Sequence, residues 1–169
     1  DQAIAAYRST IETYPGTEEA YTALDALQAL YVAQGDVDEY LAFTKNLAKI
    51  NMTVTTQEDS LLYAAAEMQY MQGAYQKATI SLGNYISQYC AGGRYCTSAR
   101  YYLADSYYRL GKTTEALGQY AVLAEMSANP YQEEAATRVA EICYDKGDYS
   151  SALEAFYRMH ALASNNENA

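Results

Sequence analysis

The chain has 169 residues, half of them apolar, and its 21 acidic against 11 basic side chains give a formal net charge of −10. This charge argues against nucleic acids and anionic membrane surfaces as partners, because both bind clustered Lys and Arg. No apolar stretch is long enough to span a bilayer, and twenty tyrosines are the compositional outlier.

Helical periodicity runs through the chain, and no run of alternating β-branched residues indicates a sheet. The pattern predicts nine helices, at 1–14, 17–34, 36–51, 56–72, 74–90, 97–110, 112–128, 130–146 and 148–163, followed by a polar tail, 164–169. Capping boxes, in which a cap side chain and a residue three positions later satisfy backbone N–H groups, are expected at three helix starts. They are Asp36 with Glu39, Thr55 with Glu58, and Asn129 with Gln132, where Pro130 would be the first helical residue.

Four glycines, Gly35, Gly73, Gly111 and Gly147, separate these helices at intervals of 38, 38 and 36 residues. A fixed period in the thirties indicates one helix-turn-helix unit that is repeated and stacked. Each glycine is expected to adopt a left-handed backbone that ends one helix and starts the next. Small residues seven before and five after the glycine would let the two helices approach closely. These positions hold Ala66, Ala104 and Ala140, and Ala78, Ala116 and Ala152.

The segment 97–130, TSARYYLADSYYRLGKTTEALGQYAVLAEMSANP, resembles the tetratricopeptide repeat family. Its signature residues are Leu103, Ala104, Tyr107, Gly111, Ala116 and Tyr120. The resemblance implies an all-α, right-handed superhelical solenoid of antiparallel helix pairs over residues 1–163, with pairs at 17–51, 56–90, 97–128 and 130–163. The unit around Gly35 departs from the signature, with Gln28, Tyr40 and Thr44 at three of its positions.

Residues 1–14 align with the second helix of a repeat, because Ala3 and Tyr7 occupy the positions of Ala116 and Tyr120. We therefore expect the chain to be a fragment of a longer protein. Its extended repeats and Leu-Ala-x-x-Tyr-Tyr-x-x-Gly-like helices loosely resemble bacterial envelope proteins, namely BamD-like outer-membrane assembly lipoproteins and Tol–Pal-associated periplasmic coordinators. That resemblance implies a periplasmic or envelope scaffold, with a cytoplasmic location as the alternative.

In the tetratricopeptide family the first helix of each unit lines a concave groove, and the resemblance assigns that groove here to columns ten, six and three residues before each glycine. Residues three and four apart share a helix face. The columns predict an acidic strip with tyrosine walls, formed by Asp25, Tyr63, Glu67, Tyr70, Tyr101, Asp105, Tyr108, Glu141 and Tyr144. A basic or aromatic protein or peptide is the expected partner.

An alternative remains for the same residues. Arg100, Arg109 and Arg138 stand where they could neutralise the strip from within the chain. The chain would then be a structural spacer or self-association module with an empty groove. The two alternatives differ in whether the groove tyrosines are exposed or covered by the chain itself.

Catalysis is not expected. The single histidine, His160, has no carboxylate or cysteine at a spacing typical of a catalytic or metal site, and no phosphate-binding loop occurs. We therefore predict a non-enzymatic chain without metal or cofactor.

The three cysteines divide into a pair and a single residue. Cys90 and Cys96 flank a short loop between units and could form a disulfide in an oxidising compartment such as a periplasm, whereas in the cytosol they would stay reduced. Cys143 takes a tyrosine packing position and is expected to be a small buried hydrophobe.

Overall fold

The structure, a computed structural model, describes residues 2–50, 52, 54, 57–91, 94–127 and 129–166. Within these residues the chain is all-α, with nine α-helices, one short 3-10 helix and no strand, which confirms the expected fold class. The predicted helix ends at 1, 51, 56 and 128, and the capping box at Thr55, lie outside the described residues. The chain forms two compact units, Asp1–Ala74 and Tyr75–Ala169.

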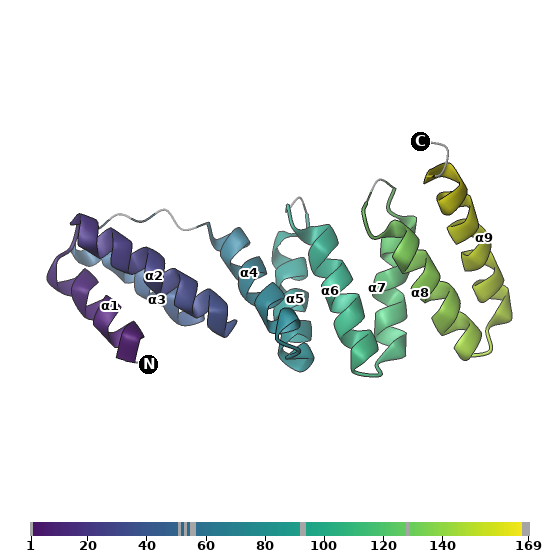
Figure 1. Ribbon diagram of the computed structural model, residues 1–169, viewed down its shortest axis with the longest axis horizontal. Coiled ribbons are helices and arrows are strands. Elements are labelled where there is room, and N and C mark those ends of the chain that lie inside the picture. The colour runs from purple at the N-terminus through teal and green to yellow at the C-terminus, as the bar shows by residue number, and fades with distance from the viewer. Residues whose placement is uncertain are drawn as a thin grey trace. The chain divides into compact units, whose positions relative to one another are not determined.

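The first unit contains four α-helices among its described residues (Figure 1). They are α1 (Gln2–Thr13), α2 (Glu18–Gln34), α3 (Asp38–Leu47), which continues into a 3-10 turn at Ala48–Ile50, and α4 (Glu58–Met71). Helix α2 begins where Thr17 caps it, since the Thr17 hydroxyl accepts a hydrogen bond from the Ala20 N–H at 3.2 Å. The core of this unit gathers Ile11, Leu24, Leu27, Tyr31, Leu41 and Leu47.

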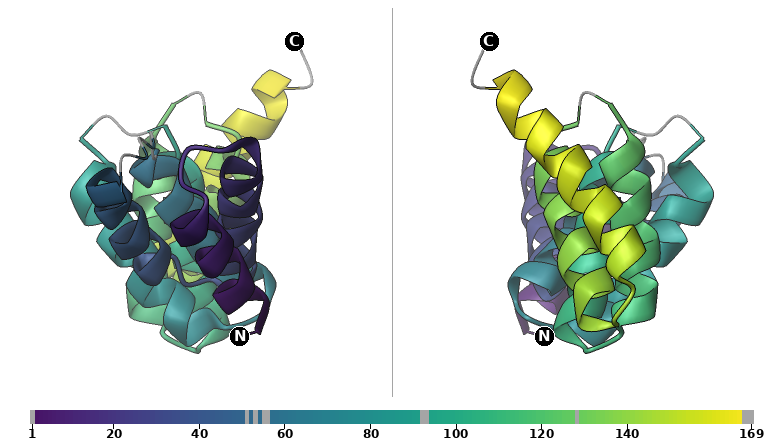
Figure 2. Two further views of the ribbon diagram at one scale, coloured as in Figure 1. Left: turned by 90° about the vertical axis from the view of Figure 1, so that its left-hand side faces the viewer. Right: turned by 90° about the vertical axis from the view of Figure 1, so that its right-hand side faces the viewer.

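Among its described residues, the second unit stacks five helices in chain order, each packed against the next (Figures 1 and 2). They are α5 (Tyr75–Tyr89), α6 (Cys96–Arg109), α7 (Thr113–Glu125), α8 (Gln132–Asp145) and α9 (Tyr149–Asn166). Their core includes Ala104, Ala116, Tyr120, Leu123, Ala135 and Ala136. This core lies between successive helices, as in a stack in which each element packs on its neighbours.

The predicted left-handed glycines are confirmed at all four turns, with φ between +67° and +76°. Each turn repeats the same two hydrogen bonds. The Gly111 N–H donates to the Tyr108 carbonyl and the Lys112 N–H to the Tyr107 carbonyl, both at 2.9 Å. This pair of bonds satisfies carbonyls that the end of a helix would otherwise leave without partners.

Small residues between α6 and α7 allow the close helix approach that the sequence predicts. Ala104 and Ala116 are fully buried, and many backbone positions of the two helices lie close together. Helices α2 and α3 have few backbone positions close together, and here Gln28 and Tyr40 stand at the two alanine positions. The Tyr40 hydroxyl donates to the Gln28 side-chain oxygen at 3.0 Å. The degenerate repeat therefore replaces a close backbone contact with a hydrogen-bonded pair of larger side chains.

The predicted capping box at Asp36 is wrong. Helix α3 begins at Asp38, so Val37 occupies the cap position and Asp36 lies one residue too early. The Asp36 carboxylate accepts instead from the Asp38 N–H at 3.3 Å. The Glu39 carboxylate does not accept from the Asp36 N–H, as a capping box requires. It accepts instead from the Tyr31 hydroxyl at 2.8 Å.

The capping box predicted at Asn129 is also wrong: the Asn129 side chain accepts from the Tyr131 N–H at 2.9 Å, but the Gln132 side chain donates to the Ala124 carbonyl, and Asn129 also binds the end of α7. Its side-chain amide donates to the carbonyls of Leu123, at 2.9 Å, and Met126, at 2.6 Å. Helix α8 begins only at Gln132, so Pro130 precedes the helix instead of opening it. A residue that satisfies the previous helix cannot be distinguished by spacing alone from one that caps the next.

A disulfide joins Cys90 to Cys96 between α5 and α6, with the two Cα atoms 5.4 Å apart. Cys143 is a free, buried thiol, as expected from its packing position. Burial raises the pKa of that thiol, since it disfavours the charged thiolate.

We expect protein refolded in oxidant to show one titratable thiol after denaturation, assignable to Cys143. Reduction should lower the free energy of unfolding by about 2 kcal/mol, because the bridge closes only a short loop. The double variant Cys90→Ser, Cys96→Ser should match the reduced protein and be insensitive to reductant. Thiol titration in denaturant, together with urea unfolding, measures both effects; three titratable thiols after oxidation would contradict the bridge.

Candidate partner-binding surface

The predicted groove residues of the first unit lie on α2 and α4. Asp25 is exposed, Glu67 and Tyr70 are half-buried, and Tyr63 is only 7% exposed. The Tyr63 hydroxyl donates to the Glu67 carboxylate at 2.7 Å, one helical turn away. Tyr63 is therefore buried and is not an open groove wall, which differs from the expectation.

Helix α4 also holds the end of α2, through two glutamines that sequence reasoning did not assign. The Gln69 amide donates to the Gly35 carbonyl, and the Gln72 amide donates to the Ala33 carbonyl at 2.7 Å. These carbonyls belong to the last turn of α2, where no intrahelical partner is available. A glutamine at the aromatic signature position was the only sequence signal for this contact.

Asp105 in the second unit differs most from its predicted role. Its side chain is buried, at 5% exposure, and accepts hydrogen bonds from the Arg109 guanidinium and from the Tyr120 hydroxyl, the latter at 3.4 Å. Tyr120 is fully buried on α7 and needs an acceptor for its hydroxyl. Burial, and then the Asp105 charge, raise the pKa of Tyr120. Asp105 thus belongs to the packing between α6 and α7.

Glu141 and Tyr108 meet at Arg138 on α8. The Arg138 guanidinium lies 5.1 Å from the centre of the Tyr108 ring and donates to the exposed Glu141 carboxylate at 2.9 Å. Arg138 thus covers one face of the Tyr108 ring. Of the three arginines expected to pair with the strip, Arg109 and Arg138 do so, whereas Arg100 donates to Gln119 at 2.7 Å.

Tyr101 contacts the segment before α8. Its ring stacks on that of Tyr131 at a centroid distance of 4.2 Å and an interplanar angle of 11°. The Tyr101 hydroxyl donates to the Glu134 carboxylate at 2.9 Å, and the Tyr131 hydroxyl donates to Ser98 at 3.3 Å. Sequence reasoning missed Tyr131, which stands outside the repeat columns beside a proline.

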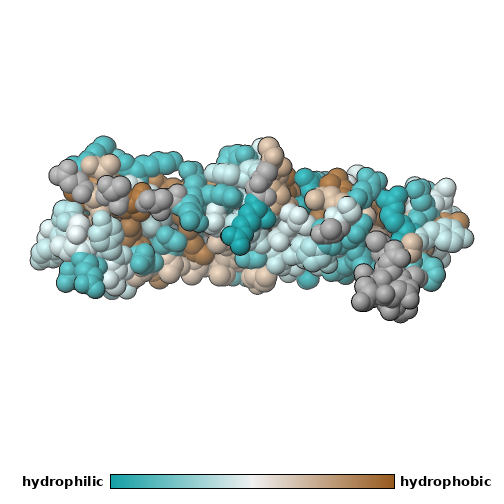
Figure 3. Space-filling view, turned by 90° about the horizontal axis from the view of Figure 1, so that it is seen from above, coloured by the Kyte–Doolittle hydropathy of each residue, from teal (hydrophilic) through white to brown (hydrophobic). Residues whose placement is uncertain are grey.

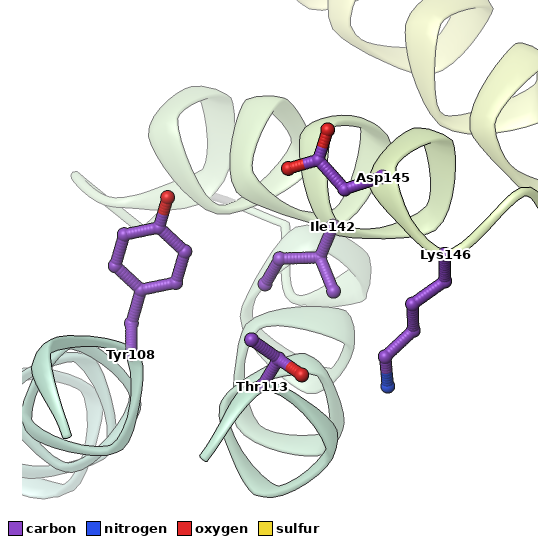
Figure 4. A pocket seen from close by; sticks show the side chains of 5 residues that line it. All are labelled: Tyr108, Thr113, Ile142, Asp145 and Lys146. Carbon is purple, nitrogen blue, oxygen red and sulfur yellow. The ribbon is translucent and has the colours of Figure 1, made fainter. Parts of the chain in front are cut away.

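A hollow of about 490 Å³ lies between α6, the start of α7 and the end of α8 (Figure 4). Tyr108, Thr113, Ile142, Asp145 and Lys146 line it. In Figure 4, Tyr108 rises from α6 on one side, Ile142 points from α8 toward Thr113, and Lys146 lies on the opposite side. The hollow therefore combines an aromatic face, an aliphatic floor and both signs of charge.

Tyr144, at the end of α8, is the most exposed of the predicted groove tyrosines, at 59%. Its neighbours Glu141 and Asp145 are exposed as well. The face seen in Figure 3 is mainly teal and white with smaller brown patches, so apolar side chains reach the surface among polar ones. Aromatic and carboxylate groups in this arrangement suit a cationic or aromatic side chain.

Two other kinds of site are absent from the described part of the chain. No group of His, Cys, Asp and Glu side chains among the described residues is placed to hold a metal ion. No described helix combines the length and apolar character needed to cross a membrane.

Comparison with known proteins gives one family match and several structural matches. The tetratricopeptide repeat family model matches residues 98–127. No curated protein matches the sequence. The structure of MamA is similar, at 18% sequence identity and a TM-score of 0.60, over 98% of this chain and 90% of that one. So is a putative kinesin light chain of Podospora anserina with nearly identical TPR-like repeats, at 18% identity and a TM-score of 0.54, over 99% of this chain and 85% of that one.

These matches agree with what the residues show. The matched segment, 98–127, contains the buried alanine pair Ala104 and Ala116 and the left-handed Gly111. The same turn recurs at the other three glycines, and the structural likeness extends the fold over nearly the whole chain. Residues 98–127 therefore match a tetratricopeptide repeat, and the chain as a whole has the fold of tetratricopeptide repeat structures.

Proposed function

We propose that this chain is a non-catalytic protein-interaction scaffold that binds a basic or aromatic segment of a partner on the face of α6 and α8. Tetratricopeptide arrays present surfaces that bind proteins. The hollow beside Tyr108 is the observation that locates the proposed binding site on this surface. A side chain entering it would meet an aromatic ring, an aliphatic floor at Ile142 and the carboxylate of Asp145.

The charge of the surface favours a basic partner over an acidic one. Arg138 already lies over the Tyr108 ring, which is the same kind of contact that a partner's Arg or Lys would make with Tyr144. Tyr144 stands beside the exposed carboxylates of Glu141 and Asp145. A cation there would gain both a ring face and an acidic neighbour.

The disulfide supports a location outside a reducing cytosol. Bridges such as Cys90–Cys96 persist in oxidising compartments, among them the bacterial periplasm. We therefore propose a periplasmic or envelope location. A cytoplasmic location would leave both cysteines reduced.

A structural spacer is the second candidate, and the burial of Asp105 and Tyr63 favours it. Both side chains satisfy neighbours within their own units rather than facing solvent. A spacer needs no ligand at the hollow, so the two functions differ in whether the α6 and α8 face binds anything.

A displayed library of random peptides, selected on the folded chain, tests this proposal. We expect enrichment of peptides with Arg or Lys next to aromatic residues. Their binding should weaken as salt is raised from about 50 to about 300 mM, because salt screens the charge pairs. Tyr108→Ala and Tyr144→Ala should each weaken binding about tenfold, as for aromatic anchors. The control Ile80→Ser removes an exposed apolar side chain of α5 and should have no effect. Failure to enrich any peptide would favour the spacer.

A further inference from the structure

A second hollow, of about 300 Å³, lies between α7, α8 and α9. It shares no lining residue with the hollow beside Tyr108. Apolar side chains form most of its lining, among them Ala121 of α7, Ala136 and Cys143 of α8, and Ala155 of α9. Ala136, Cys143 and Ala155 are buried, so they lie deep in this α7–α9 hollow.

The preceding repeat has larger side chains at three of these positions. Counted from the repeat glycines, they are Tyr107 in place of Cys143, Arg100 in place of Ala136 and Gln119 in place of Ala155. There the Tyr107 ring packs against the core, and the Arg100 guanidinium donates to the Gln119 side chain at 2.7 Å. The α7–α9 hollow therefore lies where this repeat lacks an aromatic ring and a cation that the preceding repeat supplies itself.

The mouth of this hollow is acidic. The Arg158 guanidinium lies 3.5 Å from the Glu125 carboxylate of α7 and 3.4 Å from the Glu154 carboxylate of α9. The two carboxylate side chains are 71% and 76% exposed, and one arginine does not neutralise both. The preceding repeat has the uncharged Ser87 and Gly118 at the same two positions. A cation that approaches the mouth therefore meets a net negative charge.

Stacking of a further repeat on α9 would leave this mouth open. Glu154 and Arg158 correspond in register to Gly118 and Val122 of α7, which has α8 and α9 stacked after it. Gly118 is exposed there, and Val122 is 41% exposed. In α5, Ile80 stands at the position of Glu154 and is 60% exposed. These positions face solvent in repeats that another repeat follows, so the site does not depend on which segment follows α9.

We propose that the α7–α9 hollow binds an aromatic side chain of a partner protein that carries Arg or Lys next to it in sequence. The ring takes the place that Tyr107 holds in the preceding repeat, and the cation meets the carboxylates of Glu125 and Glu154. An unfilled apolar hollow forfeits dispersion contacts along its lining, and a bound ring restores them. Apolar hollows take up aromatic groups because they offer water too few hydrogen-bond partners. This site is separate from the one proposed beside Tyr108.

A capped dipeptide of 4-fluorophenylalanine and arginine is the probe. Fluorine NMR of the probe, titrated with the full chain, should show a saturable shift with a Kd of about 1 mM, as expected for so small a ligand. Glutamate in place of the arginine should weaken binding about fivefold, because the acidic mouth repels it. A capped leucine–arginine dipeptide at equal concentration should not displace the probe. The proposal is overturned by a titration without saturation, by equal binding of the glutamate probe, or by displacement with the leucine dipeptide.

Variants that fill the hollow locate the binding. Cys143→Tyr introduces the side chain of the preceding repeat, and Ala155→Gln narrows the hollow from α9. Each should weaken binding about tenfold by excluding the aromatic anchor, whereas Ile80→Ser, at an exposed position of α5, should leave binding unchanged. Far-UV circular dichroism checks folding, and if Cys143→Tyr does not fold, Ala155→Gln decides. Undiminished binding to a folded filling variant would place the probe elsewhere and overturn the proposal. So would binding that Tyr108→Ala abolishes and Ala155→Gln preserves, which would assign the probe to the hollow beside Tyr108.

Discussion

Replacing Gly35 with Ala is expected to lower the free energy of unfolding by about 3 kcal/mol. This loss should exceed that of the same replacement at Gly111, which lies in an equivalent turn. Left-handed backbone alone costs a residue with a Cβ atom roughly 1–2 kcal/mol. At Gly35, whose φ is +67°, the added Cβ would also stand 2.6 Å from the Cγ atom of Gln69. Moving Gln69 breaks its hydrogen bond to the Gly35 carbonyl and leaves buried polar groups unpaired.

Gly111 is the matched control for this change. Its φ is +72°, but a Cβ added there meets no atom within 4 Å, so Gly111→Ala should show only the cost of the left-handed backbone. Urea unfolding of both variants measures the difference. Equal losses at Gly35 and Gly111 would mean that the contact between α4 and the end of α2 contributes little, whereas no loss at Gly111 would contradict the turn itself.

The repeated turn could be predicted from the sequence because its cause is local. A glycine at a fixed interval, followed by a residue that starts a new helix, implies left-handed backbone whatever surrounds it. The buried alanines Ala104 and Ala116 are similar, since only small residues allow so close a helix approach. Both features appear in every standard repeat, so one sequence already contains several examples of each.

Side-chain partners could not be predicted in the same way. Asp105 and Glu141 occupy the same column, yet one is buried and the other exposed. The difference comes from the opposite helix, where α7 brings the Tyr120 hydroxyl to Asp105. Gln28 and Tyr40 likewise look like two separate departures from the signature, although they compensate each other through one hydrogen bond. Such pairings depend on which side chains meet between two helices. The position of a residue relative to its repeat glycine does not specify this.

The surplus of tyrosines and the surplus of carboxylates are connected in the structure. Tyrosine hydroxyls donate to acidic side chains in both units: Tyr31 to Glu39, Tyr63 to Glu67, Tyr101 to Glu134 and Tyr120 to Asp105. A chain with few basic residues thereby gives its carboxylates neutral donors, beside the ion pairs that Glu39 and Asp105 form with Arg8 and Arg109. Each ring also contributes apolar area to the packing of its helix. Many of the twenty tyrosines therefore serve the fold, and only some remain for a partner.

Reversing the charge at Asp105 is expected to destabilise the chain by about 3 kcal/mol, while the same change at Glu141 should cost less than about 1 kcal/mol. Asp105→Lys would bury an ammonium group beside Arg109 and remove the acceptor of the Tyr120 hydroxyl. Glu141→Lys changes a carboxylate whose side chain is 45% exposed in its pair with Arg138.

Two further variants separate charge from shape at the buried site. Asp105→Asn keeps an oxygen acceptor for Tyr120 without the charge, so its cost should fall between those of the two charge reversals. Tyr120→Phe removes the hydroxyl alone, and in a double-mutant cycle with Asp105→Asn it should show coupling, because the two side chains share one hydrogen bond. Urea unfolding with unchanged m-values measures all four variants. If Asp105→Lys and Glu141→Lys destabilise equally, Asp105 is not buried against α7, and it returns to the set of carboxylates that a partner can reach.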